Sequence, residues 1–348
     1  MRQALRINCH CHIFDLNSIP LAFREKFVIN LQNPSQEWLH RGIRSLLMQG
    51  TRLEAWLGFT RLSMLEIAEL LVREMDEAGI DVALPLMVDM EYSSAYPGGV
   101  KPFEEQIRET LAVVSTINSR FSHPRLLPFI GADPRRPNVV ELVCGHLESG
   151  AFRGVKIYPV MGFLPGDERL WPIYEFCERR GIPVTAHCEN GGLPGYDGYY
   201  QLAAPENWEP VLKKFPSLVL NLAHFDRTGS PWQATIERLM REWPNVYTDI
   251  SFDTEMFWMP GTYFGNLLRV LREPILQDRL LYGTDWYMGR FLWTEKSYLE
   301  WFTRGARRIL WNPVRFLKRD IARLIDENPR RFLGGGAGSP GCHTRARP

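Results

Sequence analysis

The sequence places five residues that can bind a metal ion directly after short apolar segments. Four of the eight histidines and one aspartate share this position. These residues are His10, His12, His187, His224 and Asp285. Imidazole nitrogens and carboxylate oxygens are ligands that zinc takes in catalytic sites, usually with one position left for water. A lone buried histidine is more often a packing residue, but five metal-competent residues at matching positions predict a metal centre.

His10 and His12 form a His-x-His pair at the end of the first apolar segment. Because side chains alternate between the two faces of a strand, both imidazoles are expected on the same face. Cys9 and Cys11 would then point to the helix layer, and we interpret them as small buried packing residues. The pair can therefore offer two nitrogen ligands to one ion.

Eight short apolar segments alternate with amphipathic stretches along the chain. We predict buried parallel strands for the segments and helices for the stretches between them. From the fourth strand onward the strands start about 30 residues apart, the length of a strand with its crossover helix. The predicted strands are Leu5–Cys11, Val82–Val88, Leu126–Gly131, Gly154–Tyr158, Pro183–His187, Leu218–His224, Val246–Ile250 and Leu280–Thr284. The predicted helices include Leu65–Ala78, Asn138–Glu148, Leu170–Arg180, Trp208–Phe215 and Gln233–Glu242.

This alternation favours an α/β fold with a closed (β/α)8 TIM barrel over an open doubly wound sheet. The barrel would form a single domain over residues 1–333. In such a barrel the carboxyl ends of all strands face the same side, where active sites lie. The five candidate ligands would therefore meet at one mouth of the barrel, although they are far apart in the sequence.

Three segments exceed the regular repeat. Residues 15–64, between the first strand and its helix, are rich in apolar side chains, and we interpret them as an inserted lid over the barrel mouth. A surface subdomain that only packs on the barrel is the alternative. Residues 286–327 begin with aromatic residues and are expected to form a C-terminal helical extension. The glycine-rich tail, residues 334–348, is predicted to be disordered.

The composition disfavours several classes of function. The chain has 41 Lys and Arg against 40 Asp and Glu, a net charge of +1. This balance gives no excess of positive charge that would indicate binding to nucleic acid or to an anionic membrane. No apolar run approaches the ~20 residues that span a bilayer. The six cysteines include no Cys-x-x-Cys pair, which disfavours a zinc ribbon. We expect a cytoplasmic protein that acts on a small-molecule substrate, and assembly as a homodimer is left open.

The ordered set of motifs resembles the amidohydrolase superfamily, in particular its amidohydrolase-2 branch. That branch includes metal-dependent hydrolases, lactonases and enzymes similar to aminocarboxymuconate-semialdehyde decarboxylase. The resemblance covers roughly Leu5 to Leu333. It rests on His10-x-His12, Gly154-Val155-Lys156, His187, His224, Gly283-Thr284-Asp285, the stretch Met75–Asp81 and the closing stretch Glu327–Gly334.

The resemblance implies roles for the five candidate residues. His10, His12, His187 and Asp285 would bind a divalent metal, most often zinc, with manganese as an alternative. His224 would either complete the metal site or polarise the substrate carbonyl. Zinc lowers the pKa of a bound water to about 7. Asp285 could then accept the proton of that water and pass it to the leaving group.

Lys156 and Glu189 are further candidates at the same end of the barrel. In some amidohydrolases a lysine at the fourth strand is carboxylated and bridges two metals, but we favour a salt-bridged barrel lysine for Lys156. Glu189 shares strand parity with His187. Five other charged residues are secondary candidates for substrate binding, with a merely solvated side chain as the favoured alternative. They are Asp89, Asp133, Asp226, Asp249 and Arg290.

Two residues depart from the family pattern. Asn8 stands where relatives commonly carry Asp or Glu, and Tyr158 stands where they often carry His. Because an amide is a poorer metal ligand than a carboxylate, Asn8 disfavours a decarboxylase. We therefore expect a metal-dependent hydrolase, in which activated water attacks a lactone, ester or amide of a small organic acid or aromatic-derived substrate. A non-oxidative decarboxylase is the alternative, and a catalytically silent barrel that only binds a partner is a third hypothesis.

Overall fold

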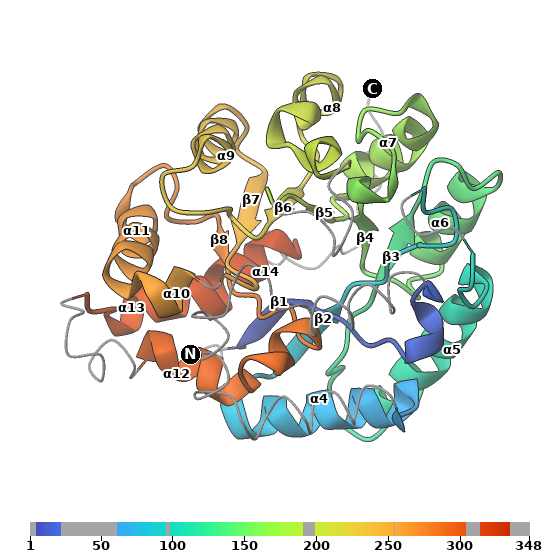
Figure 1. Ribbon diagram of the computed structural model, residues 1–348, viewed down its shortest axis with the longest axis horizontal. Helices are drawn as coiled ribbons and strands as arrows, with labels where there is room; N and C mark the ends of the chain where they lie inside the picture. Colours follow the sequence, from blue (N-terminus) through green and yellow to red (C-terminus); the bar gives the residue numbers. More distant parts are fainter. Residues whose placement is uncertain are drawn as a thin grey trace, which may run out of the picture.

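Eight parallel strands run through the centre of the computed structural model, and a ring of helices surrounds them (Figure 1). The structure describes residues 5–21, 61–94, 98–190, 199–253, 255–303 and 314–334. The strands are β1 (Ile7–Cys11), β2 (Val82–Pro85), β3 (Phe129–Ala132), β4 (Gly154–Ile157), β5 (Val184–His187), β6 (Leu220–Ala223), β7 (Val246–Asp249) and β8 (Leu280–Leu281). β1 pairs with β2, and β3 to β8 pair in sequence order.

Backbone contacts join these two sheets into a closed barrel. A parallel pairing of Leu86 with Phe129 links the end of β2 to β3. On the other side, the Cys9 N–H donates to the Tyr282 carbonyl at 2.8 Å and links β1 to the end of β8. Each of the eight predicted segments overlaps a strand; the strands are shorter, and β3 ends one residue beyond the predicted segment, at Ala132. The predicted (β/α)8 barrel is therefore confirmed.

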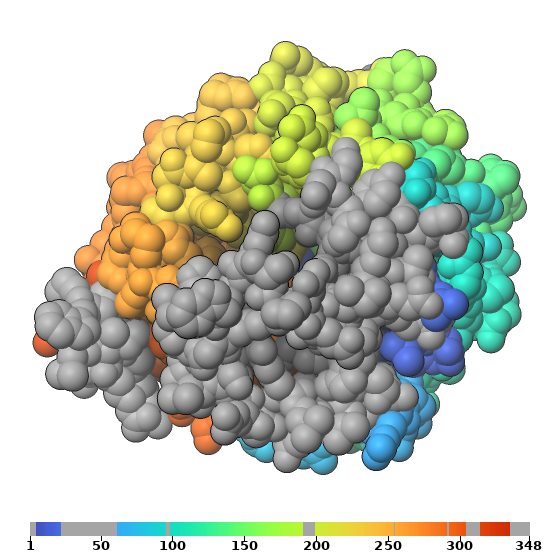
Figure 2. All heavy atoms as spheres, in the orientation of Figure 1, coloured from blue at the N-terminus to red at the C-terminus, as the bar shows by residue number. Residues whose placement is uncertain are grey.

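The helices follow the strands around the barrel in chain order. They are α4 (Met64–Ala78), α5 (Phe103–Asn118), α6 (Val139–Glu148), α7 (Trp171–Arg180), α8 (Glu209–Lys214), α9 (Pro231–Glu242), α10 (Glu255–Trp258), α11 (Pro260–Arg272), α12 (Glu295–Thr303), α13 (Lys318–Ala322) and α14 (Asn328–Phe332). The five predicted helices correspond to α4 and α6 to α9 within two residues at each end. In Figure 2 the coloured atoms follow the order of the sequence around the rim, from blue through green and yellow to orange. No helix in the described ranges is both long and apolar enough to cross a membrane.

Local sequence signals fix the ends of α4, which covers β1 and β2. The Ser63 hydroxyl accepts from the Glu66 N–H, and the Glu66 carboxylate accepts from the Ser63 N–H at 2.8 Å. This reciprocal capping satisfies backbone donors at the start of the helix. Gly79 ends the helix with φ 69°, a left-handed conformation that glycine adopts at little cost.

One extra residue in β1 changes the direction of the side chains that follow it. Asn8 lies opposite Ala83 and Cys11 lies opposite Pro85, so three steps along β1 match two along β2. Such a bulge interrupts the regular alternation of a strand. Cys9 shares the inner cluster of Ile7 and residues of β2, β3, β7 and β8, which corrects the prediction that it faces the helix layer. Cys11, beyond the shift, packs in the other core cluster. Both cysteines are fully buried, as packing residues are expected to be.

An apolar plug closes the amino-terminal end of the barrel. Phe332, the last residue of α14, packs there against side chains from β1, β2, β3, β7 and β8 and is fully buried. Its ring stacks on Phe129 and meets the edge of Tyr247. The cluster comprises Ile7, Cys9, Val82, Leu84, Leu86, Phe129, Tyr247, Leu281 and Phe332. The interior is therefore filled at one end, which leaves the carboxyl ends of the strands for a cavity.

Parts of the predicted extra segments fall outside the described ranges. Residues 22–60 of the expected lid are among these, so the lid stays a prediction. The described part of 286–327 contains α12, α13 and one π-helical turn at 323–327. The predicted tail lies outside the described residues from 335 onward.

Candidate metal centre

All seven predicted site residues line one cavity of about 300 Å³ at the carboxyl ends of the strands. They come from β1, β4, β5 and the turns after β1, β5, β6 and β8. These residues are His10, His12, Lys156, His187, Glu189, His224 and Asp285. The barrel thus brings together residues that are separated by up to 275 positions, which follows from its closure between β8 and β1.

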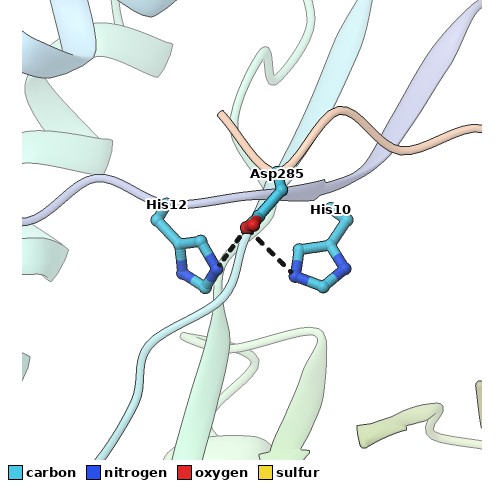
Figure 3. Close-up of side chains that lie close together, drawn as sticks. All are labelled: His10, His12 and Asp285. Carbon is cyan, nitrogen blue, oxygen red and sulfur yellow. Dashed lines mark ion pairs between the residues drawn. The ribbon is translucent and has the colours of Figure 1, made fainter. Parts of the chain in front are cut away.

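His10, His12 and Asp285 form one close group of this set, in which both histidines face the aspartate (Figure 3). The carboxylate oxygen Oδ1 of Asp285 lies 3.0 Å from His12 Nε2 and 3.5 Å from His10 Nε2. All three side chains are buried. Although burial raises the pKa of Asp285, the neighbouring imidazoles of His12 and His10 lower it below the ordinary value of an aspartate. The carboxylate is therefore ionised in this position.

The other ring nitrogens of the two histidines determine what Asp285 faces. His12 Nδ1 lies 2.7 Å from the Leu86 carbonyl, which can only accept, so this nitrogen carries the proton. His10 Nδ1 lies 3.0 Å from the carboxylate of Asp249 and donates to it in the same way. Burial lowers the pKa of His10 to about 3, so its ring is neutral. Its Nε2 therefore directs a lone pair toward Asp285.

Asp249, the last residue of β7, orients His10. It is fully buried and also accepts from Asn221 Nδ2 at 2.7 Å and from the Ser251 N–H at 3.1 Å. Although burial raises the pKa of Asp249, His10 and His224 hold it below its ordinary value. From its sequence position alone, Asp249 is a candidate only for substrate binding. Its place at the end of the seventh strand, level with the other candidates, was the signal for a closer role.

His187 pairs with His224 and is not part of the group formed by His10, His12 and Asp285. Its Nδ1 lies 3.0 Å from His224 Nε2. His224 Nδ1 lies 3.1 Å from the Ser251 carbonyl and must donate to it, so Nε2 of His224 is the acceptor from His187. Nε2 of His187 then keeps its lone pair. The rings of His224 and His10 are 4.9 Å apart, so His224 stands between the two halves of the predicted site.

The backbone is unusual where the strands end in this site. His224 and Asp285 have φ values of 80° and 52°, in the left-handed region that residues with a side chain rarely adopt. Phe225, Asp226 and Phe252, in the turns after β6 and β7, share this conformation. Such conformations cost free energy and persist where the surrounding structure holds them, often at functional sites.

Among the described residues, Lys156 lacks the salt bridge that the sequence led us to expect. It lies on β4, is 1% exposed, and its Nζ has no hydrogen-bond partner among the described residues. The favoured interpretation as a salt-bridged lysine is therefore wrong, because the nearby carboxylates of Asp249 and Asp285 are directed at the histidines. Burial lowers the pKa of Lys156 to about 8, although those two carboxylates oppose the change.

Asn8 is not directed at the cavity. Its Nδ2 lies 2.7 Å from Thr284 Oγ1 and 3.1 Å from the carboxylate of Glu295, and its Oδ1 accepts from the His10 N–H. Glu295 begins α12 and is fully buried, and it also accepts from Thr284 Oγ1 and Tyr282 OH. This carboxylate fastens β1 to the chain next to Asp285. Sequence reasoning missed Glu295 because nothing in its local sequence separates it from a surface glutamate.

The secondary charged candidates form internal contacts and are not simply solvated, as the sequence analysis had favoured. Arg136 binds Asp89 at 2.7 Å, and Arg290 donates to Glu74 at 2.7 Å. Asp133 is fully buried and accepts from its neighbour Arg135. None of these charged residues is among the described residues that line the cavity.

The donor set fits a divalent metal ion. The lone pair of the neutral His10 ring is aimed at the carboxylate of Asp285, an arrangement that a cation between them would stabilise. The Nδ1 atoms of His10 and His12 are each held by an acceptor, as is usual for metal-bound histidines. Three groups of donor atoms each lie within 4.8 Å of one another. They are His10, His12 and Asp285; His10, His224 and Asp249; and His187, Glu189 and His224.

Comparison with solved structures shows the same fold. An uncharacterised TIM-barrel protein from Bordetella bronchiseptica matches with a TM-score of 0.59 and 22% identity, over 95% of this chain and 98% of that one. A proposed 2-pyrone-4,6-dicarboxylic acid hydrolase from Pseudomonas putida gives 0.55 and 14%, over 97% and 100%. The 4-oxalomesaconate hydratase of Rhodopseudomonas palustris gives 0.54 and 14%, over 95% and 96%. At these identities the structural likeness shows the fold alone.

The sequence itself identifies the family. No match is found among curated protein sequences. The family model described as amidohydrolase, however, matches residues 7–335. This range contains every candidate ligand and all eight strands. The chain therefore belongs to the amidohydrolase family, in its amidohydrolase-2 branch.

Proposed function

We propose that this protein is a metal-dependent hydrolase in which water attacks the carbonyl of a lactone, ester or amide. The observation that carries the proposal is the arrangement of His10 and His12. Both rings donate Nδ1–H to fixed acceptors, and both Nε2 atoms face the carboxylate of Asp285. A packing cluster has no need of this arrangement, whereas a cation site requires it.

His10, His12, His187 and Asp285 would hold the ion, which we propose to be zinc, with manganese as the alternative. When bound, the metal would supply Lewis-acid polarisation and make water acidic enough to react near neutral pH. Asp285 is placed to accept the proton of the attacking water and then to give it to the leaving atom. His224 accepts from His187 at Nε2 and donates Nδ1–H to the Ser251 carbonyl, so it would orient His187 as a ligand. Polarising the substrate carbonyl would require the substrate to displace His187 from Nε2 of a protonated His224.

The walls of the cavity suit an organic substrate with an apolar body. Most described lining residues away from the histidines are aliphatic, aromatic or methionine side chains. They are Ile13, Phe14, Ile19, Met64, Leu86, Met87, Val88, Met90, Phe252 and Met288. Four methionines give such a wall an adaptable shape. This supports a small organic acid or an aromatic-derived compound as the substrate class.

A screen of lactones and aryl esters with product analysis tests the proposal. We expect the protein to retain a stoichiometric divalent ion, to lose activity on chelation and to recover it with zinc or manganese. The products should be the hydroxy acid or the acid and alcohol. Release of carbon dioxide without hydrolysis would instead establish the decarboxylase. Protein that neither retains nor binds metal would overturn both reactions.

Asp285→Asn is the sharpest variant for the proton-transfer step. An amide cannot accept the proton of the attacking water, so we expect kcat/KM to fall by about 100-fold or more with the thermal unfolding profile largely kept. Asp278→Asn, at a half-buried aspartate that pairs with Arg331, is the matched control and should remain active. A near-normal rate for Asp285→Asn would remove this residue from the proton-transfer role.

A further inference from the structure

The least satisfied charged group of the described structure lies in the cavity of the candidate site. Lys156 is only 1% exposed, and its Nζ has no hydrogen-bond partner among the described residues. A buried ammonium without a partner is strongly unfavourable, so proteins normally pair it or give it a ligand. Because Lys156 lines the cavity, the missing partner can enter from there.

The neighbours of Lys156 do not supply that partner. Its register partners in the adjoining strands are Gly131 of β3 and Thr185 of β5, which bring no charge. Asp249 and Asp285 lie near enough to influence it, but each is held by a histidine. The ring of Tyr158 has its centroid 5.7 Å from Nζ and can support a cation only weakly.

We propose that Lys156 binds the carboxylate of the substrate, and that the substrates are carboxylic acids with an apolar body. Lys156 is the only lysine or arginine among the described residues that line the cavity, so this wall accounts for one carboxylate. The apolar lining around Met64, Met87 and Met90 would receive the rest of the molecule. The identity of the reacting carbonyl rests on the proposed hydrolase function, but the anion site does not.

The placement of this anion site determines which acids fit. Lys156 precedes Tyr158, whose ring centroid lies 4.6 Å from that of His187, so the carboxylate would bind beside the candidate ligands. A substrate must then carry its carboxylate close to the scissile carbonyl. An acid with the two groups at opposite ends of a long chain could not reach both.

Binding of benzoate and of benzamide to the full-length protein tests the anion site directly. The two probes share shape, and only benzoate carries a charge. We expect benzoate to bind at least about 10-fold more tightly than benzamide, both in the metal-loaded protein and after chelation, as measured by isothermal titration calorimetry. Lys156→Met should weaken benzoate binding by about 10- to 100-fold, the usual effect of losing a charge-assisted hydrogen bond, and leave benzamide unchanged.

Two further variants make the result specific. Lys156→Gln keeps a polar group without the charge and should show the same loss of benzoate binding. Lys213→Met applies the same substitution to an exposed lysine of α8 and should bind benzoate as the wild type does. Circular dichroism confirms that each variant is folded.

Three results would overturn the anion site. The first is equal benzoate affinity in the wild type and in both Lys156 variants. The second is no preference for benzoate over benzamide in the chelated wild type. The third is an added carboxyl group on Lys156, seen by native mass spectrometry and dependent on bicarbonate, because a carboxylated lysine is an anion. If benzoate binds through Lys156 but the protein hydrolyses no lactone or ester, the proposed hydrolase function is wrong and the anion site is still supported.

Discussion

At the scale of single residues, the candidate metal centre depends on the groups that accept a hydrogen bond from Nδ1 of each histidine. The Leu86 carbonyl accepts from Nδ1 of His12, and the Asp249 carboxylate accepts from Nδ1 of His10. The Nε2 atom of each ring therefore faces Asp285. Such partners set the tautomer and the ring orientation of metal ligands, and removing them commonly weakens metal binding. Glu295 belongs to the same class, since it holds both Asn8 and Thr284 next to the ligands.

Glu295 should make stability depend on pH in a predictable direction. Burial raises the pKa of this carboxyl to about 7, above its ordinary value of 4.5. A group with a raised folded pKa contributes fully below its unfolded pKa, and the contribution is lost as the pH rises through the folded pKa. Relative to Glu295→Gln, the wild type should therefore lose on the order of 2–3 kcal/mol of unfolding free energy between about pH 4.5 and 7, with a plateau above.

Denaturant unfolding of the two proteins in matched buffers measures this difference. Glu66→Gln is the control with the opposite sign. The hydrogen bonds from Ser63 lower the pKa of Glu66, so the wild type should gain relative to that variant as the pH rises. A difference between wild type and Glu295→Gln that stays constant from pH 4.5 to 7 would show that Glu295 ionises as readily in the folded chain as in the unfolded chain.

At the scale of elements, the site exists because β1 and the end of β8 approach one another very closely. A Cβ added to Gly283 would lie 2.7 Å from the Cβ of His10, closer than real Cβ atoms come. The N–H groups of Thr284 and Asp285 both point to the His10 carbonyl, at 3.2 and 2.9 Å. Only a glycine at position 283 allows the two strands to set His10 and Asp285 at ligand distance.

Gly283→Ala should therefore separate these ligands. The strands must move apart, which we expect to cost about 1–3 kcal/mol of stability and to weaken metal binding as measured by competition with a chromogenic chelator. Gly145→Ala is the matched control, because Gly145 lies in α6 with open space around its Cα. There alanine should raise stability by about 0.5–1 kcal/mol without changing metal affinity. Unchanged metal affinity in Gly283→Ala would show that the approach is not needed.

At the scale of the whole molecule, the two ends of the barrel have separate tasks. The amino-terminal end is filled by the plug around Phe332, and the carboxyl end holds the cavity with the candidate metal centre. Since α14 lies near the end of the described chain and Ile7 lies near its start, the plug also joins the two ends of the barrel sequence. We therefore expect stability and activity to be separable.

Phe332→Ala tests this separation. Removing a fully buried ring should cost about 3–5 kcal/mol of unfolding free energy and lower the melting temperature. The metal content and KM of the protein that remains folded should match the wild type. Leu317→Ala, an exposed residue just before α13, should change stability little. A loss of metal in folded Phe332→Ala would mean that the plug also supports the site.

The sequence by itself determined the barrel and the ligand types, because both follow from local patterns. Burial on both faces makes each parallel strand a short apolar run, and a crossover helix sets the spacing, so strand ends and the residues that follow them can be read in order. The same order identified His10, His12, His187, His224 and Asp285 as one set at one mouth. The family resemblance added their roles, and the family itself is confirmed.

Only the tertiary structure decided which of these side chains meet and what holds them. Three features each depend on atoms from distant parts of the chain. They are the bulge that sets Cys9 and Cys11 in different core clusters, the contact of Asn8 with Glu295 and the absence of a described partner for Lys156. A strand's own sequence fixes its alternation but not its register against a neighbour, and one residue of slip redirects every side chain. Register, bulges and buried charge pairing are therefore properties of the closed barrel.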